Sequence, residues 1–185
     1  MSVSQIAKEV YHAHVDHFGE PADSWKFDDG KRSDVFPDRI DVMFWPTDAD
    51  CGISTFATVG MSDRPMVGAN YRVELHFSLR LSLQRAAAAP VARFLANLAM
   101  YPFQIGAALD WWHTISQPGP IPFFREASCV LLHPHFVPNG WDAISTKSGD
   151  VRILNVVPIT PAEKALKMKS RIADALSGID VFSPR

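Results

Sequence analysis

The sequence predicts an α+β fold, with a mixed and largely antiparallel sheet and helices packed against it. Three stretches alternate apolar and polar residues with the period of a strand, namely residues 39–45, 53–59 and 71–81. Two others, residues 3–18 and 90–101, repeat apolar residues at helical spacing. Runs of strands separated by single helices, without regular alternation, are typical of α+β domains.

The first 20 residues are expected to contain the first helix, over residues 3–18. Its apolar stripe would consist of Ile6, Val10, His14 and Phe18. Ser2 and Gln5 have the spacing of a capping box at its start. Gly19 and Pro21 are expected to end it.

The strand over residues 71–81 has the most regular alternation in the chain. One face would carry Tyr71, Val73, Leu75, Phe77, Leu79 and Leu81. The other would carry Arg72, Glu74, His76, Ser78, Arg80 and, just beyond it, Ser82. The pattern predicts that the apolar face packs on a core and that the polar face meets solvent or a partner. Residues 39–45 and 53–59 would form an antiparallel pair because the turn between them is short.

The middle of the chain is expected to contain a helix over residues 90–101 that Pro102 interrupts, followed by a short second segment over 105–109. Residues 116–122 contain three prolines, which remove three backbone donors, so a rigid loop is expected there.

Two short apolar runs, residues 128–132 and 151–157, are consistent with buried strands. A helix is expected to follow, since Thr160 can cap it, a proline comes next and Glu163 completes a capping box. Residues 179–182 are expected to form a last edge strand.

Length and composition favour one soluble domain over residues 1–185. A net charge of −2 gives no electrostatic reason to expect nucleic acid or a membrane surface as a partner. No apolar run approaches the roughly 20 residues that span a bilayer, and no signal peptide is expected at the N-terminus. Cys51 and Cys129 are expected to be reduced thiols in the cytoplasm.

A polar turn made of Gly60, Met61, Ser62, Asp63 and Arg64 lies between two predicted strands. The hydrolase elbow G-x-S-x-G does not fit, because no glycine follows at the required place. We expect a structural turn in which Ser62 or Asp63 bonds its own backbone. Arg64 would pair with a carboxylate such as Asp41 or Glu74.

Asp110, Trp111, Trp112 and His113 form the second unusual segment. Two adjacent tryptophans cannot both face the core from one helical turn, so one is expected to be exposed or to line a cleft. Because tryptophan is enriched at interface hot spots, these four residues are the candidates for contacting a partner. The alternative is that one ring lies in the core and the other covers it.

The ordered set of motifs resembles the suppressor-of-fused family. Gly60-Met61-Ser62-Asp63 is similar to its G-[ML]-S-D turn, and the strand that contains Glu74-Leu75 is similar to its E-L-x-[FL] strand. Trp112-His113 is similar to its later Trp-His or Gly-His pair. The remaining matches are Val130-Leu131-Leu132 and Val156-Val157-Pro158-Ile159-Thr160 with Glu163. Order and spacing agree over residues 38–182.

This resemblance implies a suppressor-of-fused-like domain that binds a protein and converts no substrate, so no catalytic residue and no cofactor are expected. In the animal protein a second domain follows and a transcription-factor peptide is held as an added strand. An aspartate before the Trp-His pair contacts that peptide, and Asp110 lies near this place. The compact form resembles bacterial members, some of which are proposed as immunity proteins that neutralise a toxin. Trp112 replaces the glycine that these members often have.

Two alternatives remain open at this point. A metal-dependent hydrolase would use clustered histidines with Asp41, Asp63 or Glu74, and it requires at least three such groups in one pocket. The histidines in question are His12, His14, His17, His133 and His135. No metal site is assigned. On the first helix His14 and His17 share a face and His12 points away, so a site would need a third ligand from elsewhere. His133 and His135 would point to opposite sides of an extended segment. A homo-oligomer would pair the strand over residues 71–81 with its copy.

Overall fold

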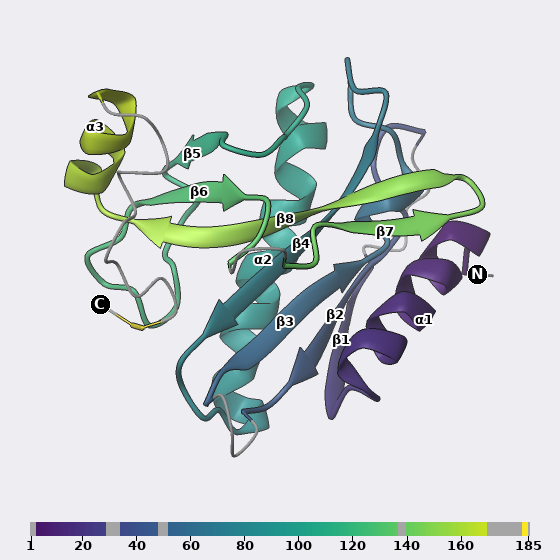
Figure 1. Ribbon diagram of the computed structural model, residues 1–185, viewed down its shortest axis with the longest axis horizontal. Helices are drawn as coiled ribbons and strands as arrows, with labels where there is room; N and C mark the ends of the chain where they lie inside the picture. The colour runs from purple at the N-terminus through teal and green to yellow at the C-terminus, as the bar shows by residue number, and fades with distance from the viewer. Residues whose placement is uncertain (1–2, 29–33, 48–51, 137–139, 170–182, 185) are drawn as a thin grey trace.

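The computed structural model describes residues 3–28, 34–47, 52–136, 140–169 and 183–184 (Figure 1). The helices are α1 (Gln5–Phe18), the 3-10 turn η1 (Met61–Asp63), α2 (Arg85–Ile105) and α3 (Pro161–Lys169). The strands are β1 (Asp23–Phe27), β2 (Ile40–Trp45), β3 (Ser54–Val59), β4 (Arg72–Leu79), β5 (Thr114–Ser116), β6 (Cys129–His133), β7 (Ala143–Thr146) and β8 (Gly149–Ile159).

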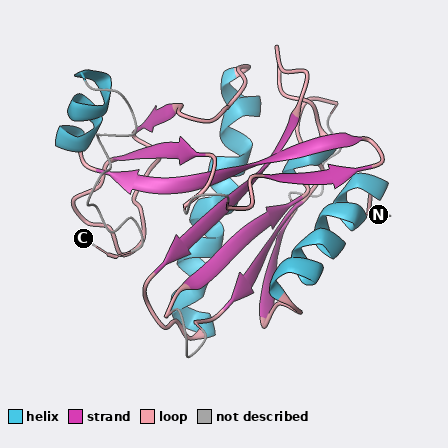
Figure 2. Ribbon diagram, in the orientation of Figure 1, coloured by secondary structure: helices cyan, strands magenta, loops and turns pink. Residues whose placement is uncertain are grey.

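The described strands form one open sheet in the order β1-β2-β3-β4-β8-β6-β5 (Figure 2). Every neighbouring pair is antiparallel except β4 and β8, which run parallel. β7 pairs with the first part of β8, and β6 pairs with its second part. The predicted α+β class, with a mixed and largely antiparallel sheet, is confirmed.

The two long helices cover opposite faces of this sheet, and α2 passes behind it in Figure 1. The larger core lies under α2, where Val91, Leu95 and Ala99 meet Phe56 and Phe77. The smaller core lies under α1, and its members are Ile6, Ala7, Val10, Met43, Trp45, Ala57, Val59, Ile144, Val151 and Ile153. β1 and β5 are the strands at the two ends of the sheet.

Both faces of β4 are buried, which corrects the expectation that its polar face meets solvent or a partner. Glu74 is 0% exposed and His76 is 4% exposed, because α1 and the turn around η1 cover that face. Alternation therefore predicted the strand correctly but not the surroundings of its second face. β4 also lies between β3 and β8, so neither of its edges is available to pair with a second copy.

The helix boundaries differ from the predictions in two places. Ser4 caps α1, since its hydroxyl accepts a hydrogen bond from the Ala7 amide. α2 runs unbroken through Pro90 and Pro102. Pro102 removes one bond in the last turn, where the packing of Phe103 and the cap at Gly106 compensate.

The capping box at α3 is confirmed, since the Thr160 hydroxyl accepts from the Glu163 amide and the Glu163 carboxylate accepts from the Thr160 amide. β5 and β7 were not predicted, because three or four residues give too short a pattern. Cys129 is a buried free thiol. Ser2, Cys51 and the strand predicted over residues 179–182 lie outside the described residues.

Candidate functional site

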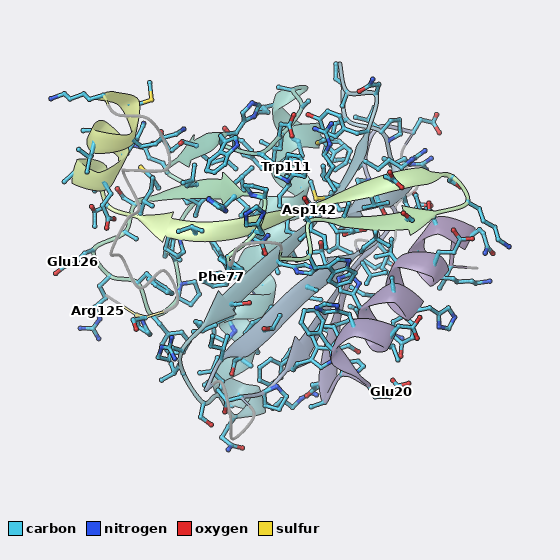
Figure 3. All side chains as sticks on the ribbon, viewed as in Figure 1. Glu20, Phe77, Trp111, Arg125, Glu126 and Asp142 are labelled. Atoms are coloured by element: carbon cyan, nitrogen blue, oxygen red, sulfur yellow. The ribbon has the colours of Figure 1, made fainter. Side chains whose placement is uncertain are left out.

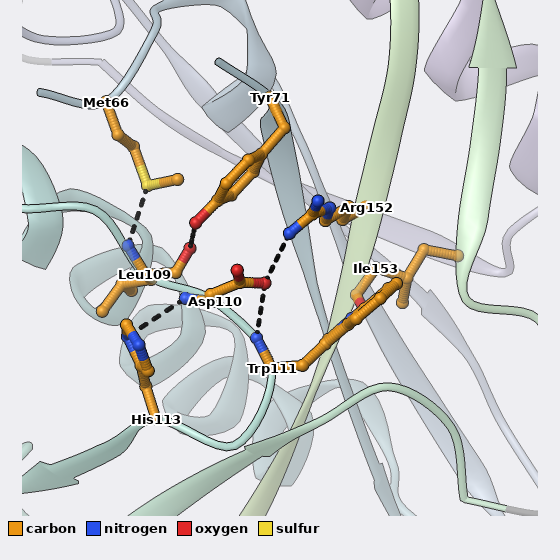
Figure 4. Close-up of polar contacts among 8 residues, drawn as sticks. All are labelled: Met66, Tyr71, Leu109, Asp110, Trp111, His113, Arg152 and Ile153. Atoms are coloured by element: carbon orange, nitrogen blue, oxygen red, sulfur yellow. Dashed lines mark hydrogen bonds and ion pairs between the residues drawn. The ribbon is translucent and has the colours of Figure 1, made fainter. Parts of the chain in front are cut away.

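Asp110 begins the candidate segment and forms an ion pair with Arg152 of β8, with 2.7 Å between Oδ1 and Nη1 (Figure 4). The same oxygen accepts a hydrogen bond from the Trp111 amide. Burial alone would raise the pKa of Asp110, but the bonds from Arg152 and Trp111 outweigh it and lower the pKa. The Arg152 guanidinium lies 3.8 Å from the centre of the Tyr71 ring and 5.0 Å from that of Trp111.

Trp111 is half-buried against the larger core, and its indole N–H donates to the carbonyl of Ile153 at 3.0 Å. The Ile153 amide in turn donates to the carbonyl of Asp142. Both contacts lie at the point of β8 where β7 ends and β6 begins, and Figure 3 shows Trp111 and Asp142 beside β8. The Trp111 side chain thus bonds β8 at the place between its pairing with β7 and its pairing with β6.

Trp112 contacts β6, and its backbone φ of 69° lies in the left-handed region. Its amide donates to the Leu132 carbonyl, and the Leu132 amide donates to the carbonyl of His113. Trp112 and His113 therefore both lie opposite Leu132. This arrangement is a β-bulge of the type whose first position is normally a glycine with positive φ. The Trp112 ring packs edge-on against His133 at 4.4 Å, and the His113 side chain is exposed.

The segment continues directly into β5, the edge strand that pairs with β6. The Leu132 amide of β6 donates to the His113 carbonyl, and the Gln117 amide donates to the carbonyl of Ser128, the residue just before β6. Because backbone groups of alternate residues point to opposite sides of a strand, Thr114 and Ser116 direct their N–H and C=O groups to the outer side of β5. All four candidate residues therefore stand at the start of an edge strand.

Glu74 joins the two halves of the sequence motif. Its Oε1 accepts hydrogen bonds from the Gly60 amide and from the amide and hydroxyl of Ser62, and its Oε2 accepts from Thr58. Burial raises the pKa of Glu74 to about 7, against the lowering effect of these bonds. Gly60 has a φ of +112°, and a Cβ there would lie 2.4 Å from the Arg39 carbonyl oxygen.

These contacts correct the predicted turn chemistry. The Ser62 hydroxyl donates to Glu74 instead of bonding its own backbone, and the Asp63 carboxylate accepts from the Ser4 hydroxyl at the start of α1. Arg64 pairs with Asp38, at 3.5 Å, and Asp41 pairs with Arg39. The motif residues Gly60, Met61, Ser62, Asp63 and Glu74 form a buried or half-buried structural unit.

His12 and Asp41 line one pocket, but no third histidine, cysteine or carboxylate among the described residues lines it with them. His14 and His76 lie 2.8 Å apart between their Nε2 atoms, inside a cluster of aromatic rings, and the carboxylates of Asp41, Asp63 and Glu74 have the separate partners given above. Within the described residues, no group of three or more His, Cys, Asp or Glu could hold a metal ion. The described part of the chain thus gives the hydrolase alternative no support.

Sequence reasoning missed Arg152, Tyr71 and the two lysines of α3 that contact β5. Arg152 occupies an alternating position in an apolar run, a weak signal that a buried strand carries one charge for a specific partner. Lys164 and Lys167 are three residues apart on a predicted helix, which indicates a shared face but not what that face meets. None of the described helices could cross a lipid bilayer.

Comparison with known proteins identifies the fold. A family model described as "Suppressor of fused protein (SUFU)" matches residues 37–182. No curated protein sequence matches the chain. Three solved structures are similar at 14% to 17% sequence identity, a level that shows the fold alone.

The structure of a putative SUFU homologue from Neisseria gonorrhoeae has 14% identity and a TM-score of 0.65, with 97% of this chain and 94% of that chain covered. A Sufu–Fu complex has 17% identity and a TM-score of 0.62, covering 92% of this chain and 80% of that one. Drosophila Suppressor of Fused has 14% identity and a TM-score of 0.62 over 97% of this chain, which spans 49% of the Drosophila chain. Since the family model covers most of the sequence, this chain belongs to the suppressor of fused family.

Proposed function

We propose that this protein is a non-enzymatic binding domain that captures a protein partner at the outer edge of β5. The observation that carries the proposal is the continuity of the 110–113 segment with that edge strand. Asp110 and Trp111 fix the segment to β8 through Arg152 and Ile153, so Trp112 and His113 stand in a defined place at the start of the edge. A fixed aromatic side chain beside an edge strand suits partner recognition.

Strand addition is the mechanism that we infer. An incoming extended segment would pair with the outward N–H and C=O groups of Thr114 and Ser116. Such pairing satisfies backbone donors and acceptors whatever the partner's sequence, and the side chains near the edge then select among partners. The partner-contacting residues in this proposal are Trp112 and His113, while Asp110 and Trp111 position them.

Two similarities support a protein as the ligand. A solved structure with this fold is titled as a complex of Sufu with Fu, so a related domain forms a complex with another protein. The fold also matches a bacterial homologue over 94% of that chain. For the partner class we propose a toxin that the protein neutralises in the cytoplasm, and the buried free thiol of Cys129 supports a reducing compartment.

The test is a capture experiment with identification of the partner. Tagged protein is incubated with lysate of the source cells, and bound proteins are identified by mass spectrometry and then purified. Binding of the purified partner is measured by calorimetry for the wild type, for Ser116→Pro and for Ser116→Ala. Proline removes the outward amide of β5, so it should abolish binding, whereas alanine should retain it.

The toxin assignment has its own readout. Expression of the purified partner alone should arrest growth, and co-expression of this chain should restore it. A partner that binds at the edge of β5 but does not impair growth would overturn the toxin assignment and leave the binding function intact. A partner that binds equally to Ser116→Pro would overturn the proposed edge.

A further inference from the structure

Two lysines of α3 contact β5 and the residue that precedes it, next to the edge described above. The Lys167 ammonium donates to the Trp112 carbonyl at 2.6 Å and to the Thr114 hydroxyl at 2.8 Å. The Lys164 ammonium donates to the Ser116 hydroxyl at 2.6 Å. Figure 1 shows α3 beside β5, at the opposite end of the molecule from α1. The lysine pair therefore contacts both residues whose backbone groups face outward, Thr114 and Ser116, through their hydroxyls, and it contacts the Trp112 carbonyl where the edge begins.

The attachment of α3 to the described residues is almost entirely polar. None of its residues is buried, and its two large apolar side chains, Leu166 and Met168, are 48% and 71% exposed. The capping box joins it to the end of β8, and the lysine pair joins it to β5. An element with so little buried apolar surface can leave its place at a small free-energy cost.

The geometry points to a closed edge that opens for an acidic partner strand. We propose that the lysine pair covers the outer edge of β5 in the free protein and that the partner is an extended segment with carboxylates at alternate positions. This inference rests on the proposed function, because it concerns the same edge.

The positions of the lysines support the covered edge, and their charge supports an acidic partner. A strand that pairs with Thr114 and Ser116 would meet the Lys167 ammonium at the Trp112 carbonyl, where the edge begins, and would lie beside the Lys164 ammonium at Ser116. Released from neutral hydroxyl and carbonyl acceptors, the two ammonium groups need new partners, and carboxylates form stronger, charge-assisted bonds than the acceptors that were lost. The side chains of Thr114 and Ser116 share one face of β5, so acidic residues two apart on the incoming strand would meet both lysines.

Exchange of backbone amides with solvent tests the closed edge in the protein alone. In the double variant Lys164→Met/Lys167→Met, the outward amides of Thr114 and Ser116 should exchange at least fivefold faster than in the wild type. Lys169→Met is the matched control, because Lys169 is an exposed lysine of the same helix without a contact to β5 in the described structure. Equal exchange in the double variant and the control would overturn the closed edge.

Binding of synthetic peptides tests the partner chemistry. The probe is a fluorescein-labelled, acetylated peptide Thr-Glu-Val-Glu-Val-Glu-Thr, compared by anisotropy with counterparts that carry Gln or Lys in place of Glu. We expect the wild type to bind the Glu peptide about tenfold more tightly than the Gln peptide. In the double lysine variant this preference should shrink to less than twofold, while the Lys169→Met control keeps it.

The outcomes separate this inference from the proposed function. If all three peptides bind equally and Ser116→Pro abolishes their binding, the edge is correct and the acidic preference is wrong. If the Lys peptide binds best, the charge argument is overturned in the same way. If no peptide binds the wild type or the double variant, strand addition at β5 fails, and this inference fails with it.

Discussion

Trp112 is one of three described non-glycine residues whose backbone φ is positive. A left-handed conformation costs a residue with a Cβ about 1–2 kcal/mol, and the position is one that a glycine normally occupies in such a bulge. The side chain gains only an edge-on contact with His133 in return. Strain that the local packing does not repay is often found at functional sites, which is why we assign the Trp112 ring to partner contact.

Replacement of Trp112 by glycine should separate stability from binding. Relief of the left-handed strain and the greater freedom of glycine in the unfolded chain nearly cancel, so the free energy of unfolding should change by less than about 1 kcal/mol. Affinity for the purified partner should fall about 30-fold, as at a typical hot spot. Urea unfolding and calorimetry measure the two effects.

The control for this variant is Trp112→Val, since a β-branched residue is poorly tolerated at positive φ and should destabilise the protein by about 2 kcal/mol. A glycine variant that unfolds easily but still binds its partner would show that the ring is structural.

Glu74 explains at the residue level why the two halves of the motif occur together. Its Oε1 receives all three donors from Gly60 and Ser62, so a side chain that keeps an oxygen at this point preserves the turn. Glu74→Gln should therefore lower the free energy of unfolding by about 1 kcal/mol. Glu74→Ala leaves buried donors without an acceptor and should lower it by about 4 kcal/mol.

Thermal and urea unfolding of both Glu74 variants checks this ordering. Equal losses for glutamine and alanine would mean that the negative charge, and not the acceptor geometry, holds the turn.

At the scale of elements, α1 is attached to the sheet by a hydrogen bond between two buried histidines. His14 of α1 donates from Nδ1 to the Val10 carbonyl, so its Nε2 accepts from His76 of β4 at 2.8 Å. This arrangement needs a neutral His14. Burial lowers the pKa of His14 to about 4, and burial together with His14 and His17 lowers that of His76 well below its usual value.

The pair should make stability fall in acid. Both folded-state pKa values lie below that of an unfolded histidine, so the unfolded chain binds more protons and stability is lost as the pH falls from about 6.5 towards 4. Between pH 7 and 4.5 the wild type should lose about 5 kcal/mol more than the variant His14→Gln/His76→Gln, because each of the two histidines contributes about 1.4 kcal/mol per pH unit over roughly two units below 6.5. Urea unfolding over this pH range measures the difference.

Glu74 acts in the opposite direction, because its raised pKa of about 7 makes stability fall as the pH rises from its unfolded value. It is present in both proteins of the comparison, and its contribution cancels. Parallel pH profiles for the wild type and the double histidine variant would show that the pair does not couple the position of α1 to pH.

Elements with long periodic patterns could be predicted from the sequence, and elements set by distant partners could not. Seven regular residues sufficed for β2, and three capping signals fixed the start of α3. β5 was missed because its short strand is defined by pairing with β6, which lies 15 residues away along the chain. α2 was divided in error at Pro102, since packing of Phe103 outweighs the loss of one hydrogen bond.

For the whole molecule, the motif order predicted the family, but the site required the folded structure. Asp110 and Trp111 are held in place by Arg152 and Ile153, about forty residues later in the chain. The lysine pair comes from a helix about fifty residues later. Sequence spacing cannot show that these three segments meet at one edge. It does identify Trp112 as a residue in an unusual place, because a glycine would have been expected there by family resemblance.

At the scale of the whole molecule, we propose that one edge of one sheet receives a protein partner. Hydrogen exchange of the purified complex, compared with that of the free protein, tests it most directly. We expect protection to concentrate on residues 112–116, with release of α3 seen as faster exchange over Pro161–Lys169. Protection confined to β1, at the other end of the sheet, with unchanged exchange over 112–116, would contradict partner binding at the edge of β5.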